Sequence, residues 1–368
     1  MAKWTEPRKA ELARRVAAGQ LSPQIATEMG LSRSSVLNAI ARFGLTHAPK
    51  VYSPKRFERN GIFKRLNDAT SIEDVLARVY DDLERLGKQQ AKTPKPTRKT
   101  KKSGDILVEL STPDLHVGKL AWGPETGHGS YDIHIAEQVF TNAVNSMVAR
   151  AESLPERVER WLFPVGNDLL QTDNVLGTTT SGTQVDSDGR YIKSFRRACT
   201  LMTWAIDRLS QVAPVTTVIV PGNHDRLTAF HVGDVLAAYY RSVPEVTIDN
   251  EPTLRKYVTY GACLLGFTHG SEEKEADLPL IMAQEMPQAW KDTTHREWHI
   301  GHFHKIRERR WSAGDSFGGV RVRVLPALCA PDAWHSMRGF IGEMRAAEMY
   351  LWSREGYVGH FAHTVRAS

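Results

Sequence analysis

The chain has 368 residues, of which 41% are hydrophobic and 24% charged, and its formal net charge is +6. This composition is typical of a globular protein with two or three domains, and it excludes collagen-like, disulfide-rich and wholly disordered chains. The sequence has no apolar run long enough for a membrane span, no secretory signal at its charged start and only three widely spaced cysteines, so we expect a cytoplasmic protein without membrane association.

Positive charge is concentrated in the first 105 residues, which hold 22 Lys and Arg against 11 Asp and Glu. The remainder holds 26 basic against 31 acidic residues. A basic segment of this kind favours a polyanionic partner, nucleic acid first and an anionic membrane second. The alternative is a basic face that meets only solvent.

Residues 1–48 are predicted to form a small helical domain. Helices are expected over about 6–18, 22–30 and 32–43, with a tight turn at Gly30. Their apolar residues have the spacing of one shared core: Ile25, Ala26, Leu31, Val36 and Ile40.

Three of these positions match the helix-turn-helix. The small Ala26 lets two helices approach, Gly30 permits a positive φ in the turn, and Val36 packs the second helix down. The segment resembles the helix-turn-helix of resolvases and phage regulators, which implies DNA binding; a plain three-helix bundle with an assembly role is the alternative. The residues expected to contact DNA lie on or near the exposed face of the third helix: Arg33, Ser34, Ser35, Asn38 and Arg42.

Residues 49–103 are predicted to connect two domains. A capping box at 71–74 opens a helix over 71–86 with an apolar stripe, which either packs on a neighbouring domain or forms a homodimer. Residues 91–103 are rich in Pro and Lys, which predicts a flexible basic tether.

Residues 104–368 are predicted to form one α/β or α+β domain. Apolar runs recur and end in polar, Gly-bearing loops: DILVELS, RWLFPVG, VTTVIVPG, CLLGFTHG, EWHIGHFH and VRVRVLP. Helical patterns lie between several of them, at 132–153, 194–213 and 231–242. This alternation predicts stacked strands with helices outside.

Polar residues follow five of these runs at the point where each strand would end. They are Asp114-Leu115-His116, Gly166-Asn167-Asp168, Gly222-Asn223-His224-Asp225, His269-Gly270 and Gly301-His302-Phe303-His304. Ligands bind at this edge of layered α/β folds, and alternate residues of an extended chain point the same way, so both ends of D-x-H or H-x-H can face one metal. Oxygen and nitrogen donors without thiolates suit Mn, Fe or Zn.

This series of motifs resembles that of the calcineurin-like metallophosphoesterases over about 104–330. Residues 114–119 and 301–304 are similar to phage-encoded phosphoesterases akin to repair exonucleases, as is Asp332-Ala333-Trp334-His335, for which no role is assigned. The resemblance implies a two-sheet β-sandwich flanked by helices, with a dimetal centre at one edge. It also implies a phage origin, and hence a host cytoplasm.

The resemblance implies a role for each motif residue. The first metal would take Asp114, His116, Asp168 and His304, and the second would take Asp168, Asn223, His269 and His302. His224 would lie beside the leaving group, and Asp225 would steady it.

The second motif departs from the family pattern, because Asn167 intervenes where Gly-Asp is usual. A carboxylate bridges two cations better than a neutral amide, so Asp168 is the predicted bridge. Asp173 and Asn174 are alternative candidates, which would otherwise shape the substrate cleft.

The predicted cofactor is a pair of divalent metal ions, Mn²⁺ first, with Fe or Zn as alternatives. Such a pair turns a bridging water into a hydroxide that attacks phosphorus, and His224 could protonate the departing oxygen. We therefore predict an enzyme that hydrolyses phosphodiester bonds in DNA, a nuclease or end-processing enzyme, because a basic helix-turn-helix segment is attached to it.

Two further interpretations stay open. One is a phosphomonoesterase, protein phosphatase or cyclic-nucleotide esterase that the N-terminal domain localises. The other is a non-catalytic DNA-binding regulator. The acidic balance of the second part argues against a long DNA-binding groove there but allows a local one.

Two polar loops, 118–133 and 174–191, each follow a motif and are expected to overhang the site. Lys119, Arg190 and Lys193 either contact substrate phosphates or carry ordinary solvated charge.

Overall fold

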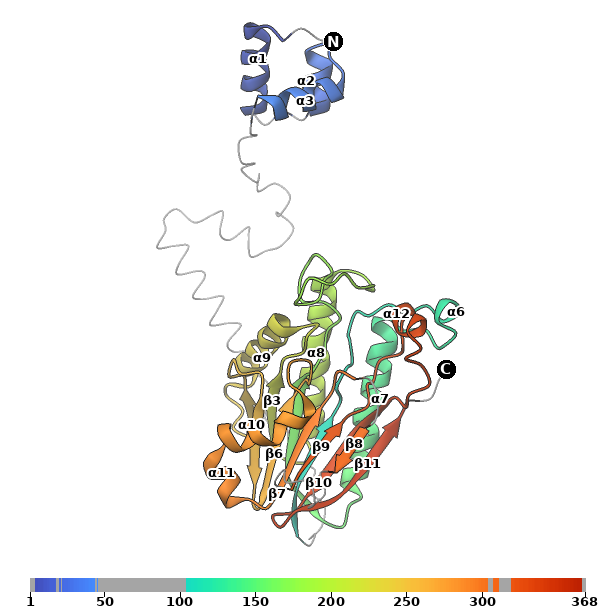
Figure 1. Ribbon diagram of the computed structural model, residues 1–368, viewed down its shortest axis with the longest axis vertical. Coiled ribbons are helices and arrows are strands. Elements are labelled where there is room, and N and C mark those ends of the chain that lie inside the picture. The colour runs from blue at the N-terminus through green and yellow to red at the C-terminus, as the bar shows by residue number, and fades with distance from the viewer. Residues whose placement is uncertain are drawn as a thin grey trace. The chain divides into compact units, whose positions relative to one another are not determined.

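The structure, a computed structural model, describes residues 4–17, 20, 22–43, 45, 104–303, 307–310 and 319–365. The chain divides into two compact units, Met1–Lys88 and Gln89–Ser368, which are coloured along the chain in Figure 1. The predicted connector 49–103, with the possible homodimer helix 71–86, lies outside the described residues, as does His304.

The first unit contains three helices, α1 (Glu6–Ala17), α2 (Ser22–Glu28) and α3 (Arg33–Arg42). The Ser35 amide donates to Ser32 Oγ at 3.2 Å and so caps α3, and Gly30 turns the chain with a φ of +63°. The buried core of this unit takes side chains from all three helices: Leu12 and Val16 from α1, Ile25 and Ala26 from α2, and Val36 and Ala39 from α3.

The second unit is built on two sheets. The first has the strand order β11-β10-β1-β2-β3-β4, in which β1 to β4 run parallel and the last two strands of the chain add antiparallel. Its strands are β1 (Asp105–Ser111), β2 (Arg157–Gly166), β3 (Val215–Val220), β4 (Val246–Asp249), β10 (Ala346–Trp352) and β11 (Tyr357–Thr364).

The second sheet has the order β5-β6-β7-β9-β8, with β6, β7 and β9 parallel. Its strands are β5 (Lys256–Tyr260), β6 (Cys263–Thr268), β7 (His295–Ile300), β8 (Arg307–Arg310) and β9 (Val320–Val324). The β-strand period of two explains the layering: along β1, Ile106 and Val108 face helices, whereas Leu107 packs with Leu265 between the sheets.

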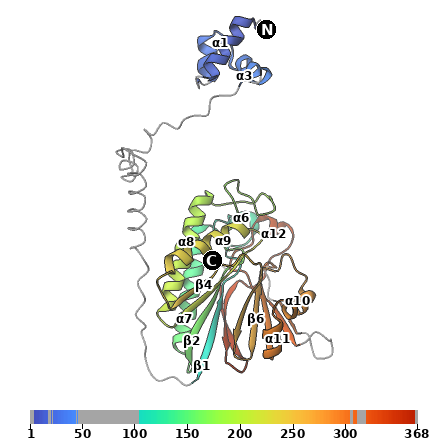
Figure 2. The ribbon, with the colours of Figure 1, turned by 90° about the vertical axis from the view of Figure 1, so that its left-hand side faces the viewer.

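Helices cover both outer faces, which gives the order helix, sheet, sheet, helix seen in Figure 2. The first sheet packs against α7 (Ile133–Glu152), α8 (Tyr191–Ser210) and α9 (Arg226–Tyr240), and the second against α10 (Leu278–Glu285) and α11 (Pro287–Asp292), which the 3-10 turn η2 (Glu275–Asp277) precedes. Two short helices, α6 (Gly123–Thr126) and α12 (Ala333–Met337), lie together, because Ser336 Oγ donates to the Thr126 carbonyl at 3.0 Å.

The predicted α/β class is therefore confirmed. Helix α9 begins at Arg226, about five residues before the predicted start near 231. The reason is that a residue distant in the sequence caps this helix. The Asp173 carboxylate accepts from the Leu227 and Thr228 amides at 3.2 and 2.8 Å, so the start of the helix is not encoded by a capping side chain next to it. None of the helices described has the length and apolar character needed to cross a membrane.

Candidate metal centre

The candidate site lies where strands of both sheets end. Because β1, β2 and β3 are parallel, the loops that follow them are neighbours at one edge. Backbone hydrogen bonds hold these loops together: the Asp114 amide donates to the Asn167 carbonyl at 2.8 Å, and the Asn167 amide donates to the Val220 carbonyl at 2.5 Å.

The backbone is strained at this edge. Within the described part of the chain, every non-glycine residue with a positive φ belongs to one of the motifs: Asp114, His116, Asn167, Asp168 and His302. Such conformations cost about 1–3 kcal/mol each and persist where the surrounding structure holds them, which is characteristic of functional sites.

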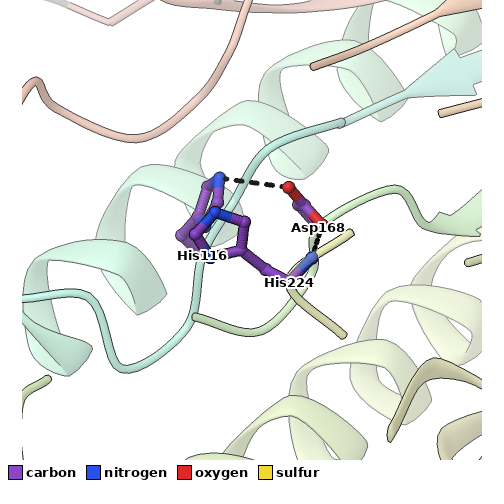
Figure 3. Close-up of side chains that lie close together, drawn as sticks. All are labelled: His116, Asp168 and His224. Carbon is purple, nitrogen blue, oxygen red and sulfur yellow. Dashed lines mark hydrogen bonds and ion pairs between the residues drawn. The ribbon is translucent and has the colours of Figure 1, made fainter. Parts of the chain in front are cut away.

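Asp168 lies at the centre of the site. Its Oδ1 accepts from the His224 amide at 2.8 Å, and its Oδ2 lies 3.8 Å from His116 Nε2 and 3.2 Å from His269 Nε2 (Figure 3 shows the side that includes His116 and His224). Burial opposes the charged carboxylate, but the charge and hydrogen bond of His269 outweigh burial and hold the pKa of Asp168 well below its usual range. The carboxylate is therefore ionised.

The first group of donor atoms comprises His116, Asp168 and His224, whose nearest ligand atoms lie within 4.8 Å of one another. Asp114 joins it, with Oδ1 3.8 Å from His116 Nε2. Burial lowers the pKa of His116 to about 3, so its imidazole is neutral and offers a lone pair, the form in which histidine binds metals.

The second group comprises Asp168, His269 and His302 within the same limit of 4.8 Å. Asn223 Oδ1 lies 2.7 Å from His269 Nε2 and 3.0 Å from His302 Nδ1, and the two nitrogens are 3.2 Å apart. Donor atoms about 3 Å from one another match ligands that each lie about 2.1 Å from one metal ion.

These buried His and Asp groups could hold a metal ion, and the set of nitrogen and oxygen donors suits a transition metal. The structure brings together all the predicted metal ligands except His304, which lies outside the described residues: Asp114, His116, Asp168, Asn223, His269 and His302.

Two residues that sequence reasoning missed orient the histidines. His269 Nδ1 donates to Asn167 Oδ1 at 2.5 Å, which leaves Nε2 facing Asp168 and Asn223. His224 Nδ1 donates to the Gln171 backbone carbonyl at 2.9 Å. The extra Asn167 in the second motif was a visible signal, whereas a backbone carbonyl leaves no trace in residue types.

Asp225 does not hold the His224 ring as expected. Its carboxylate accepts from the Leu170 and Gly222 amides, both at 3.0 Å, so it ties two loops together, and the ring is held by Gln171 instead. Burial, reinforced by the charge of Asp168, raises the pKa of Asp225 to about 8.

The alternative candidates for the bridge have other roles. Asp173 caps α9, and Asn174 Oδ1 accepts from the Leu176 amide at 2.9 Å to form a local turn. Neither takes part in the groups of donor atoms found among the described residues.

Two glycines are required at the centre. A Cβ atom on Gly222 would lie 2.5 Å from the Asp168 backbone nitrogen and closer still to its carboxylate. A Cβ atom on Gly301 would lie 2.6 Å from Asn167 Oδ1 and 2.8 Å from Asp114 Oδ2. Both positions need the absence of a side chain rather than a special φ.

The three residues predicted to contact substrate phosphates differ in their exposure to solvent. Lys119 is 1% exposed and pairs with Asp332 Oδ2 at 3.1 Å, so it links the loop after His116 to the residues that begin α12. Asp332 also caps α12 by accepting from the His335 amide at 3.0 Å, which gives that stretch a structural role. Arg190 and Lys193 are exposed.

In the first unit, the predicted DNA contacts lie on α3. Ser34, Asn38 and Arg42 are exposed and Ser35 is half-buried, whereas the side chain of Arg33 is outside what the structure describes.

Comparisons with family models, curated proteins and solved structures do not assign this chain to a family. No family model matches the chain, and no curated protein matches it. Among solved structures, the chain is similar to the crystal structure of a hypothetical protein from Thermus thermophilus, at 8% identity and a TM-score of 0.32, over 72% of this chain and 100% of that one. At this TM-score the similarity carries no argument about fold or activity.

Proposed function

We propose that the second unit is a metal-dependent phosphoesterase of the calcineurin-like class, which hydrolyses phosphodiester bonds in DNA. One observation carries the proposal: the ionised Asp168 carboxylate is shared by two groups of buried donors at the edge where strands of both sheets end. The layering of two sheets between helices is compatible with that class.

The proposed cofactor is a pair of divalent ions, Mn²⁺ first, with Fe or Zn as alternatives. Asp114, His116 and Asp168 would hold one ion, with His304 as a further expected ligand. Asp168, Asn223, His269 and His302 would hold the other. When bound, such ions act as Lewis acids on a phosphoryl oxygen and lower the pKa of water.

His224 is the proposed general acid. The Gln171 carbonyl holds its Nδ1–H, and Asp168 Oδ1 holds its backbone amide, so Nε2 is the atom left to give a proton to the leaving oxygen. Gln171 and Asn167 act as positioning residues, because each fixes one histidine ring through a single hydrogen bond.

DNA is the proposed substrate because the first unit has the three-helix arrangement with an exposed polar face on α3, and the first 105 residues are basic. A hydrolase joined to such a unit meets DNA at a raised local concentration.

The test uses the full chain with Mn²⁺ on bis-p-nitrophenyl phosphate, p-nitrophenyl phosphate and labelled single- and double-stranded DNA. We expect hydrolysis of the diester and of DNA, and a loss of about 10²–10⁴-fold in His224→Ala. His360→Ala, an exposed histidine on β11, is the control and should keep full activity. Hydrolysis of the monoester alone, or inactivity with added metal, would overturn the proposal.

A further inference from the structure

A hollow of about 460 Å³ lies beside the candidate metal centre. Its lining includes Gly118, two residues after His116, and Thr172, which follows the Gln171 that holds His224. Residues 175–177, 187 and 189–192 form another part of its lining, so the hollow is enclosed mainly by the second of the two predicted loops and the start of α8.

A second hollow of about 490 Å³ lies over the N-terminal half of α8. Both hollows are lined by Arg190 and Ile192, so they adjoin one another, and we name the pair the α8 groove. Its lining extends from Gly118 and Thr172, which lie close in the chain to residues of the site, to four cationic side chains: Arg190, Lys193, Arg196 and Arg197.

Three of these cations are available to a ligand. Arg197 pairs with Glu137 at 3.3 Å, whereas Arg190, Lys193 and Arg196 are exposed and have no carboxylate partner in the described part of the chain. Lys193 and Arg196 lie one helical turn apart on α8, about 4.5 Å along its axis, so they can meet neighbouring anionic groups. The charge is local, because residues 106–368 hold an excess of acidic residues.

Apolar side chains accompany the cations. Val175, Leu176 and Ile192 are 72%, 76% and 57% exposed, and all three line the hollow beside the metal centre. A ligand that contacts both the cations and these apolar side chains must combine regularly spaced anionic groups with flat apolar faces. A single nucleic-acid strand does so, whereas a duplex hides the faces of its bases in the stack.

We propose that the α8 groove binds a single DNA strand that continues from the phosphodiester at the metal centre. Its phosphates lie along Arg190, Lys193 and Arg196, and its bases contact Leu176 and Ile192. The proposal rests on the proposed function and narrows its substrate to an unpaired strand, present as such or frayed from a duplex end.

The test compares two charge-matched variants of the full chain. Arg190→Ala/Lys193→Ala/Arg196→Ala removes the three groove cations. Arg160→Ala/Arg241→Ala/Lys291→Ala removes three exposed cations at the start of β2 and at the ends of α9 and α11, outside the groove. Both keep the first unit and its tether, so any background binding by those segments is the same.

Fluorescence anisotropy with a labelled single-stranded oligonucleotide, without metal and over a range of salt, measures binding. Each neutralised phosphate contributes about −0.7 to the slope of log K against log salt for a single strand, so the groove variant should lose about 2 from that slope and bind about tenfold or more weakly. The control variant should match the wild type.

Cleavage gives the second readout. In the groove variant, the ratio of oligonucleotide hydrolysis to bis-p-nitrophenyl phosphate hydrolysis should fall by about tenfold, while the control keeps the wild-type ratio. Equal binding by the groove and control variants overturns the proposal, and so does an equal loss of duplex and single-strand affinity. If the wild type hydrolyses no ester, the proposed function fails, but the anisotropy comparison still tests the groove.

Discussion

The Asp168 carboxylate lies among imidazoles from three other motifs. His269, with Nε2 3.2 Å from Oδ2, opposes its protonation most, whereas the neutral His116 lies 3.8 Å away as a lone-pair donor. A negative charge held in place among neutral or weakly basic ligands is the arrangement that favours binding of a divalent cation over binding of protons.

Asp168→Asn tests this role directly. The amide keeps the size of the side chain but removes the charge that both groups of donors share, so we expect Mn²⁺ affinity to fall by about 100-fold or more. Isothermal titration calorimetry measures it. Asp186→Asn, an exposed carboxyl in the neighbouring loop, should bind Mn²⁺ like the wild type. Unchanged affinity in Asp168→Asn would remove Asp168 from the site.

Gly222→Ala tests the close packing of the loops. The new Cβ atom would overlap the Asp168 carboxylate and lie 2.5 Å from its backbone nitrogen, so the loop must shift. We expect a loss of about 1–3 kcal/mol of stability and a Tm lower by about 3–10 °C in calorimetry. Gly359→Ala adds the same atom where nothing lies within 4 Å, and its Tm should stay close to the wild type. Equal Tm values for the two variants would contradict the geometry.

At the scale of elements, β1 and β7 are joined by a buried hydrogen bond between the sheets. His299 Nδ1 donates to Glu109 Oε1 at 2.5 Å, and Ser111 Oγ donates to the same oxygen at 2.6 Å. Glu109 and His299 are both almost completely buried. Because β1 leads to Asp114 and β7 leads to His302, this pair fixes the two strands that carry one ligand of each group.

Replacing Glu109 alone should therefore lower the free energy of unfolding more than replacing Glu109 and His299 together. Glu109→Leu leaves His299 and Ser111 without their acceptor, and we expect urea unfolding to show a loss of about 1–3 kcal/mol for each buried group left unpaired. Glu109→Leu/His299→Phe replaces the pair by apolar groups and should recover part of that loss, with a coupling energy of about 0.5–3 kcal/mol in a double-mutant cycle. Strictly additive losses would show that the two side chains act independently.

The sequence predicts the strands that carry the site better than the contacts between them. The runs that become β1, β3 and β6 are mostly apolar and buried on both faces, and β2 and β7 end in buried segments; each of the five strands is followed by its motif. The pairing of Glu109 with His299 joins residues 190 positions apart, and no local pattern encodes it.

Contacts between residues that are distant in the sequence also explain the wrong predictions around the motifs. The start of α9 depends on Asp173 from a distant loop, and the His224 ring depends on a backbone carbonyl rather than on the adjacent Asp225. Strands β10 and β11 were not predicted at all; they follow the strands of the second sheet in the sequence but pair antiparallel with the first sheet, beside β1.

At the scale of the whole molecule, the chain joins a basic unit, Met1–Lys88, with 16 Lys and Arg against 10 Asp and Glu, to a unit, Gln89–Ser368, that holds 32 of each sign. If both proposals hold, recognition and hydrolysis of DNA are separate properties of separate units. The first unit supplies affinity for a duplex through α3, and the α8 groove receives a strand. Damage to one unit should then leave the structure of the other intact.

Asn38→Ala/Arg42→Ala tests the first unit. Both side chains are exposed on α3, so the fold of the unit should persist, while duplex affinity falls by about tenfold or more. Loss of one cation should also reduce the slope of log K against log salt for a duplex by about 0.9. Electrophoretic mobility shift at several salt concentrations measures both. Arg8→Ala removes one positive charge from the exposed part of α1. It should change the duplex affinity and the salt slope less than the α3 variant does. If the two variants bind duplex DNA equally well, α3 is not the recognition helix, and the basic charge of the first unit acts without a defined binding face.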